Sequence, residues 1–172
     1  TQGKQTVLQF NSAPNATGAW TETIVPIQSE SQLRTRAWVE DNRRKVDSLS
    51  NGRVAYIWVP NTGDGGFTSF NRYFFAQQDK AGAVIDERFN GGGTADDYMV
   101  DITARVRRSG FTNEAEGGRA IQMPQGITGP KVMLINGLAG SGGDYFPWSF
   151  RLLKVGPLIG MRTWGGLVAN AS

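Results

Sequence analysis

From Arg53 onward the sequence alternates short apolar runs with glycine-rich loops and segments of helical periodicity, and this alternation restricts the fold most. The apolar runs are nearly continuous, as strands buried on both faces are. They span 54–59, 83–89, 131–135 and 158–163. Between the first two, Phe67, Phe70 and Phe74 recur at helical spacing, so we expect this aromatic stripe in the core. The alternation predicts an α/β fold with a mostly parallel sheet covered by helices.

The first 28 residues predict a β-hairpin that precedes this alternation. Two runs of strand-forming residues, 4–10 and 21–27, flank a stretch rich in Asn, Ser, Pro and Gly. A lone hairpin is marginally stable in water, so we expect this one to dock on another element. The expected domains are therefore the hairpin at 1–28 and an α/β unit at 29–172.

Capping-box spacings predict where two helices begin. The one at Ser29–Gln32 opens a helix that ends near Ser48, before the Asn-Gly pair at 51–52. The other, at Thr94–Asp97, opens a helix that we expect to run through Val106.

The last helix carries Phe146, Phe150 and Leu153 at helical spacing, and we expect all three to face inward. Its Pro147 is placed in the first turn, where a missing N–H costs no hydrogen bond. Residues 109–130 form a long stretch that contains Gly and Glu, and we expect it to be the least ordered part of the chain.

The composition excludes several kinds of catalytic site. The chain has no Cys, which removes disulfides, thiolate catalysis and Cys-ligated zinc. It has no His, so a complete Ser-His-Asp triad cannot exist within it. Acidic residues near strand ends make a Mg²⁺ or Ca²⁺ site conceivable, but their spacing supports none, and we predict no metal and no cofactor. These residues are Asp64, Asp86, Asp96, Asp97 and Asp144, of which the last two are expected to cap helices.

Charge and hydropathy exclude two classes of partner. The formal net charge of +3 is too mild to predict nucleic-acid binding, and the basic triplet 43–45 is expected to be a solvated helix face. No apolar run approaches the length that spans a bilayer, and the first residues lack the layout of a signal peptide. Since the chain does not begin with Met, we expect a processed or excised piece of a longer protein.

The glycine-rich loops follow the strands, at 61–66, 90–93 and 136–144. In a parallel sheet the carboxyl ends of the strands share one edge, where ligands gather. Ser141 is the strongest candidate there, because it follows a buried strand, lies among glycines and precedes a helix. A nucleophilic serine needs such small neighbours, and needs N–H groups for the oxyanion, which a helix N-terminus supplies. Gly142 is placed to give one of them.

Two simpler interpretations stay open at this point. On spacing alone Ser141 is favoured as a helix N-cap, because the segment 139–143 misses the first glycine of the G-x-S-x-G elbow. The glycines at 91–93 let a backbone pass close to a ligand and aim N–H groups at an anion, but a tight turn explains them as well.

Four segments, in this order and spacing, carry a resemblance to a known family. They are Gly52–Ile57, Asp86–Gly93, Ala139–Asp144 and Arg162–Gly166. Together they resemble the tricorn proteases, in particular the second catalytic subdomain, within the superfamily of C-terminal-processing serine peptidases. The resemblance covers about residues 30–166 and implies a ClpP/crotonase-like spiral of strands and helices. The opening hairpin resembles the end of the PDZ domain that precedes this subdomain in the family.

The resemblance implies a role for each candidate. Ser141 would be the acylating nucleophile, and the N–H groups of Gly142 and of Gly93 or Gly92 would form the oxyanion hole. It implies a serine endopeptidase that acts on unfolded peptides, forms homo-oligomers and needs no metal or nucleotide. It favours a cytoplasmic location, with an exported parent left open.

The sequence departs from the family in ways that matter. The lysine base of the tail-specific branch is absent, because Gly165 and Gly166 follow Thr163-Trp164, as in the tricorn branch. There the resemblance implies a histidine from the first catalytic subdomain and a glutamate downstream of the serine, and we expect both outside this chain. Thr112 stands closest to a family aspartate associated with basic substrate residues, so a preference for Lys or Arg is not expected.

A second function fits the same residues. The hairpin offers a strand edge to an extended peptide, so the chain is alternatively a non-catalytic peptide-binding or assembly module in which Ser141 only caps a helix. An unrelated α/β hydrolase is the weakest hypothesis, because it would need a His after Ser141 in the chain, and the chain has no His.

Overall fold

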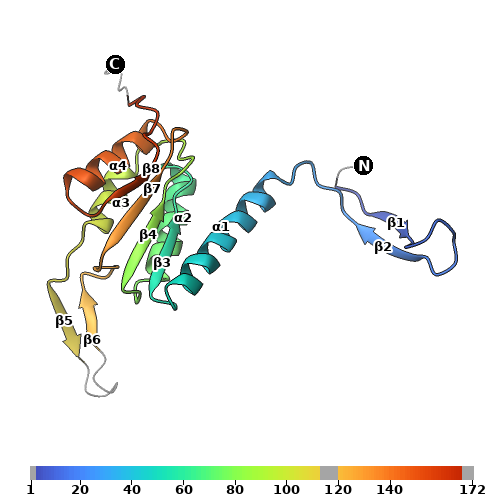
Figure 1. Cartoon of the computed structure of the whole chain (residues 1–172), viewed down its shortest axis with the longest axis horizontal. Helices are drawn as coiled ribbons and strands as arrows, with labels where there is room; N and C mark the ends of the chain where they lie inside the picture. The colour runs from blue at the N-terminus through green and yellow to red at the C-terminus, as the bar shows by residue number, and fades with distance from the viewer. Residues whose placement is uncertain (1–2, 113–119, 168–172) are drawn as a thin grey trace. The chain divides into compact units, whose positions relative to one another are not determined.

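A computed structural model of the chain describes residues 3–112 and 120–167. The chain forms two compact units, residues 1–39 and 40–172, and the division falls inside helix α1 (Ser31–Leu49). Each unit is described by itself, with the elements labelled as in Figure 1.

The first unit contains the predicted antiparallel hairpin. Strands β1 (Thr6–Phe10) and β2 (Trp20–Ile24) pair from Thr6 opposite Ile24 to Phe10 opposite Trp20. The Phe10 and Trp20 rings stack with their centroids 6.0 Å apart, as expected for an aromatic cross-strand pair. The hairpin is confirmed, whereas its origin in a PDZ domain stays a prediction.

The helix that follows begins and ends close to the predicted residues. The Ser29 hydroxyl accepts a hydrogen bond from the N–H of Ser31 at 3.2 Å, at the start of α1. In the second unit, α1 ends at Leu49, and Asn51 and Gly52 follow with φ values of 52° and 74°. These left-handed conformations are the usual way in which a helix is terminated.

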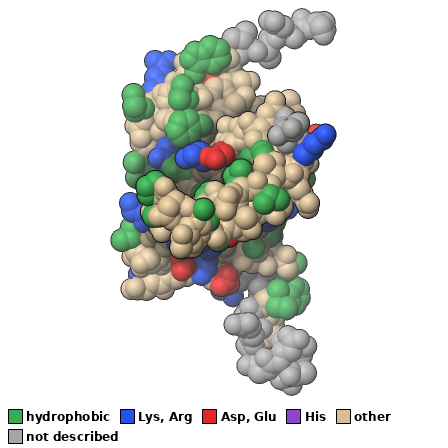
Figure 2. Space-filling model, turned by 90° about the vertical axis from the view of Figure 1, so that its right-hand side faces the viewer, with side chains coloured by type: hydrophobic (Ala, Val, Ile, Leu, Met, Phe, Trp, Pro, Cys, Tyr) green, Lys and Arg blue, Asp and Glu red, His purple; other side chains and the backbone are tan. Residues whose placement is uncertain are grey.

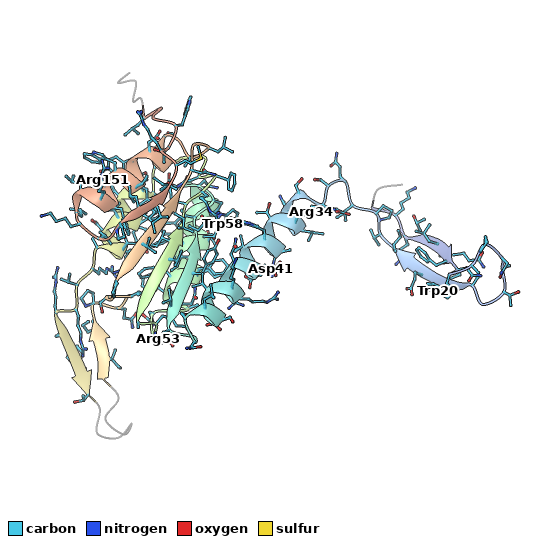
Figure 3. The ribbon with its side chains drawn as sticks, in the orientation of Figure 1. Trp20, Arg34, Asp41, Arg53, Trp58 and Arg151 are labelled. Carbon is cyan, nitrogen blue, oxygen red and sulfur yellow. The ribbon has the colours of Figure 1, made fainter. Side chains whose placement is uncertain are left out.

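The second unit is built on a four-stranded parallel sheet, which confirms the predicted α/β class. Its strands lie side by side in chain order and are β3 (Val54–Trp58), β4 (Gly82–Asp86), β7 (Lys131–Ile135) and β8 (Leu158–Gly160) (Figure 1). Figure 3 shows Arg53 and Trp58 at opposite ends of β3, so the Trp58 end marks the carboxyl edge of the sheet.

Three helices follow α1 in this unit, and their aromatic side chains form much of its core. They are α2 (Asp64–Phe75), α3 (Asp96–Thr103) and α4 (Gly142–Leu152). Large core side chains include Phe70 and Phe74 from α2 and Phe146 and Phe150 from α4, all fully buried with apolar residues of the central strands. None of the helices in the described residues combines the length and the apolar character that a bilayer crossing requires.

Residues 109–130 contain more regular structure than the sequence predicted. Strands β5 (Ser109–Thr112) and β6 (Ala120–Met123) form a second antiparallel hairpin, with Ser109 opposite Met123. The part of the predicted excursion at 113–119 lies outside the described residues.

Five side-chain and boundary predictions were wrong. Phe67 is 42% exposed and its ring lies against Tyr98 of α3 rather than in the core, because it belongs to the first turn of α2. That helix begins at Asp64, inside the expected loop 61–66. Val106 is exposed beyond the end of α3, since the Arg-rich stretch after Thr103 stays in solvent.

The other two errors concern α4. Leu153 is exposed because it is the C-cap and lies past the last buried turn. Pro147 is in the second turn, because the helix begins earlier than expected, at Gly142. Its missing N–H therefore leaves the carbonyl of Gly143 without its usual helical donor.

Candidate active site

Ser141 lies at the N-terminus of α4, directly after the loop that follows β7, and it is exposed. It occupies the N-cap position, which was the simpler of the two predictions. Its backbone has φ 58° and ψ −119°, a conformation that residues with a side chain rarely adopt and that costs of order 1–3 kcal/mol. Such strain at an exposed serine after a buried strand is typical of functional turns.

The turn at 90–93 lies directly against the turn that carries Ser141. A methyl group placed on Gly92 would lie 2.7 Å from the Ser141 Cβ, and one placed on Gly142 would lie 3.0 Å from the Gly93 nitrogen. The Gly140 N–H also donates to the carbonyl oxygen of Asn90 at 3.0 Å. The structure thus brings together Ser141, Gly142, Gly92 and Gly93, as the active-site interpretation requires.

The N–H groups of this contact are not equivalent. The Gly92 N–H donates to the side-chain Oδ1 of Asn90 at 2.9 Å and is therefore engaged. Within the described residues, the N–H groups of Gly93 and Gly142 have no hydrogen-bond partner. Of the two glycines that the sequence left open, the geometry favours Gly93 as the second donor beside Gly142.

A third loop, which contains Pro60 and Thr62, is hydrogen-bonded to the 90–93 turn. The Thr62 N–H donates to the Gly92 carbonyl at 2.9 Å, and the Gly91 N–H donates to the Pro60 carbonyl at 3.2 Å. Thr62 forms a parallel bridge with Gly93. A methyl group on Gly93 would come within 2.2 Å of Thr62 backbone, so a glycine is required there.

Asn90 is a fully buried residue that the sequence did not single out for this task. Its Nδ2 donates to Glu87 Oε2 at 3.2 Å, and its two oxygens accept from the Gly92 and Gly140 N–H groups. Its position between a buried strand and a run of glycines is the only sequence signal for this role.

Glu87 is fully buried, and its carboxyl group contacts Asn90 of this turn. Burial raises its pKa to about 9, the Asn90 hydrogen bond acts in the opposite direction, and the nearby Asp144 and Asp86 charges raise it further. The carboxyl group is therefore neutral near pH 7. It is a structural acid in this arrangement rather than a charged partner of Ser141.

Asp144, expected as a helix cap, has that role and a wider one. Its Oδ2 accepts from the Ser141 N–H at 2.9 Å and from the Gly166 N–H at 2.8 Å, and its Oδ1 accepts from the Gly165 N–H at 2.7 Å. Burial alone would raise its pKa, but the Thr163 hydroxyl and these three N–H groups outweigh burial and hold the pKa below its usual value. The carboxylate is charged at neutral pH.

An open cleft of about 320 Å³ lies beside Ser141. Its lining residues are Asn90, Gly91, Gly137, Leu138, Gly140, Ser141 and Trp164. Leu138 and Trp164 are each 72% exposed and give the cleft apolar walls. Thr112 is an exposed residue at the end of β5 and is not among the lining residues.

Two observations concern metal and nucleic-acid binding. In the part of the chain that the structure describes, no three His, Cys, Asp or Glu side chains gather in a way that could hold a metal ion. On the face drawn in Figure 2, the Lys and Arg side chains are dispersed among other residue types rather than gathered in one patch.

The sequence matches a family profile over most of its length. The profile, described as peptidase family S41, covers residues 53–172. The chain belongs to peptidase family S41. This confirms the family resemblance that the four segments carried.

Among S41 relatives, the chain is similar to tricorn proteases of archaea. It is 38% identical over 142 residues to the tricorn protease of Thermoplasma volcanium, covering 83% of this chain and 14% of the relative. It is also 38% identical over 148 residues to a tricorn protease homolog of Saccharolobus solfataricus, covering 85% of this chain and 14% of the relative. The chain thus spans a small part of the relatives that it matches.

The fold is similar to a solved structure of the same group. The crystal structure of the tricorn protease superposes with a TM-score of 0.87 and 31% sequence identity, covering 98% of this chain and 16% of that chain. The S41 assignment therefore rests on sequence and fold together.

Proposed function

We propose that this chain carries the nucleophile of a tricorn-like serine endopeptidase. Ser141 would attack the scissile carbonyl, and the N–H groups of Gly142 and Gly93 would bind the oxyanion of the tetrahedral intermediate. The observation that carries this proposal is the contact of two glycine turns beside an exposed, strained serine, with two N–H groups free of partners in the described residues.

The general base is proposed to come from outside these residues. The chain has no His, and a serine hydroxyl without a base is a weak nucleophile. A histidine and a supporting glutamate would be supplied by another part of a longer protein or by another subunit. The 172-residue chain alone should therefore hydrolyse peptides hardly at all.

The substrate is proposed to be an unfolded peptide lying in the cleft between Leu138 and Trp164. An extended chain can place its scissile carbonyl at Ser141 while a side chain contacts these apolar walls. Homo-oligomer formation and a PDZ-like origin of residues 1–28 belong to the same proposal, since both follow from the similarity to tricorn proteases.

A fluorophosphonate probe tests the proposal directly, because it reacts only with an activated serine. The test uses the natural protein, meaning the longest natural polypeptide that contains these 172 residues. We expect peptide mapping to place the label on Ser141, and expect Ser141→Ala to remove both label and peptide hydrolysis. Ser109→Ala, which removes another exposed serine, should keep both. An unlabelled Ser141 in an active preparation would reject the proposal.

A second candidate function is a non-catalytic peptide-binding module. It is favoured by the β1–β2 hairpin, whose strands are exposed and whose edges can pair with an extended peptide. Under this hypothesis Ser141 caps α4 and has no catalytic role. Peptide binding that survives Ser141→Ala, together with no labelling of the natural protein, would support it.

A further inference from the structure

The Asp144 carboxylate joins two parts of the chain that are about twenty residues apart. One part is the nucleophile turn, through the Ser141 N–H at 2.9 Å. The other is the segment 163–166, through the N–H groups of Gly165 and Gly166 at 2.7 and 2.8 Å. Thr163, in the same segment, also lowers the pKa of this carboxylate. We call these contacts the Asp144 network.

The segment 163–166 also touches the chain on the other side of Ser141. The Trp164 N–H donates to the Ala139 carbonyl at 2.8 Å. The indole lies so close to Gly140 and Gly166 that a methyl group on either would come within 2.7 Å or 2.4 Å of its Cε3. The Trp164 indole therefore lies against Gly140 and Gly166, although most of its surface is exposed.

These contacts go beyond what a helix cap needs. A capping carboxylate at the third helical position accepts the N–H of the N-cap residue, which here is Ser141. One acceptor would satisfy that donor. Asp144 uses the rest of its capacity on Gly165 and Gly166, which belong to no helix.

We propose that Asp144 is a positioning residue, which holds the Ser141 backbone and the Trp164 wall of the cleft in one fixed arrangement. The nucleophile and the surface that receives the substrate are then placed by a single charged group. This inference rests on the proposed function where it concerns reaction rates, and on the network alone where it concerns geometry. A charged carboxylate suits the role, since hydrogen bonds to ionised acceptors are the stronger ones.

Two variants separate positioning from capping. Asp144→Asn replaces one acceptor oxygen by an NH₂ group, which faces N–H donors and breaks the network. Asp144→Glu keeps a carboxylate that can reach back to the N-cap N–H, as Glu does in capping boxes, but displaces it from Gly165 and Gly166. Asp64→Asn is the matched control, because Asp64 is an exposed acidic residue in the first turn of α2.

The first measurement is NMR of the backbone amides in the 172-residue chain. We expect the Gly165, Gly166 and Ser141 amide resonances to shift together in Asp144→Asn, and the Gly165 and Gly166 resonances to shift in Asp144→Glu. Asp64→Asn should move none of them. Gly165 and Gly166 resonances that stay unchanged in both Asp144 variants would overturn the network.

The second measurement is the rate of fluorophosphonate labelling of Ser141 in the natural protein, at a temperature where all variants are folded. We expect both Asp144 variants to label about 10- to 100-fold more slowly, as small misplacements of reacting groups do. The melting temperature of Asp144→Glu should stay near wild type. A Glu variant that restores the full rate would show that the cap suffices and would overturn the inference.

The two proposals fail in different ways. If the wild-type natural protein is not labelled, the proposed function fails, and the amide measurement still decides whether Asp144 holds the two segments. If the wild type is labelled and Asp144→Asn reacts at the same rate, only the positioning role fails.

Discussion

Gly92 faces Ser141 so closely that a methyl group on Gly92 would lie 2.7 Å from the Ser141 Cβ. Gly92 also has φ 84°, a left-handed conformation that a side chain disfavours. Both the position and the conformation of this residue therefore require glycine. The contact makes the 90–93 turn part of the surroundings of Ser141.

Gly92→Ala should destabilise the second unit by about 2–3 kcal/mol, because it adds overpacking to backbone strain. It should also slow fluorophosphonate labelling of Ser141 in the natural protein. Gly91→Ala is the control: no atom lies within 4 Å of a methyl group added there, so its free energy of unfolding should change by less than about 0.5 kcal/mol. Urea unfolding checks both, and equal stabilities of the two variants would contradict the contact.

Ser141→Gly should raise the free energy of unfolding by about 1 kcal/mol while removing all labelling. The gain follows from relief of the strain at φ 58°, less the greater backbone freedom of glycine in the unfolded chain. Ser141→Ala removes the same hydroxyl and keeps the strained backbone, but it also loses the N-cap side chain of α4, so its free energy of unfolding should fall by about 1 kcal/mol. Urea melts of the three chains decide the matter, and a Gly variant no more stable than the Ala variant would argue against stored strain.

Glu87 should make stability fall as pH rises from about 5 to 9. Its folded pKa of about 9 lies above the unfolded value of 4.5, so in this window the unfolded chain has released a proton that the folded chain keeps. Each pH unit then favours unfolding by up to about 1.4 kcal/mol. The Gln side chain of Glu87→Gln cannot ionise. The free energy of unfolding of this variant, relative to that of the wild type, should therefore increase between pH 5.5 and 8.

The control for this prediction is Glu40→Gln. Hydrogen bonds from Arg43 and Tyr73 hold the Glu40 pKa below its usual value, so Glu40 is charged throughout the window. Its replacement should shift stability by the same amount at both pH values. Urea melts in matched buffers measure all three proteins, and a Glu87→Gln difference that is constant with pH would refute a neutral buried Glu87.

Trp164→Ala should raise the KM of the natural protein for peptide substrates by about tenfold, because one apolar wall of the cleft is lost. Trp148→Ala is matched to it, since Trp148 is half exposed on α4 and does not line the cleft. Steady-state kinetics with a fluorogenic peptide compare the two. If Trp148→Ala raised KM as much as Trp164→Ala, the cleft would not be the substrate site.

Outside residues 109–130, the order of elements and several residues of the candidate site could be predicted from the sequence. Apolar runs and glycine loops placed the parallel strands, and Ser141 with the glycines at 91–93 was found from its position after those strands. These features are local, so a single segment reveals them. Whether a side chain at a helix end is buried depends on where neighbouring helices lie. The exposure of Phe67 and Leu153 could therefore not be predicted.

The supporting residues could not be predicted for the same physical reason. The sequence predicts Asp144 only as a helix cap, because its contacts with Gly165 and Gly166 exist only in the folded chain. The sequence predicts Asn90 only as a turn residue. In the structure its two oxygens accept hydrogen bonds from N–H groups of two different loops. Contacts between distant segments leave no periodicity in the sequence, and only the fold brings them together.

The three loops at the carboxyl edge of the sheet are tied to one another by their own main chains, from Thr62 to Gly92 and from Asn90 to Gly140. Under the proposed function, a partner that brings a histidine would meet loops that are already held together. If the proposed function holds, we expect the rate at which such a partner binds to be set by encounter rather than by rearrangement of these loops.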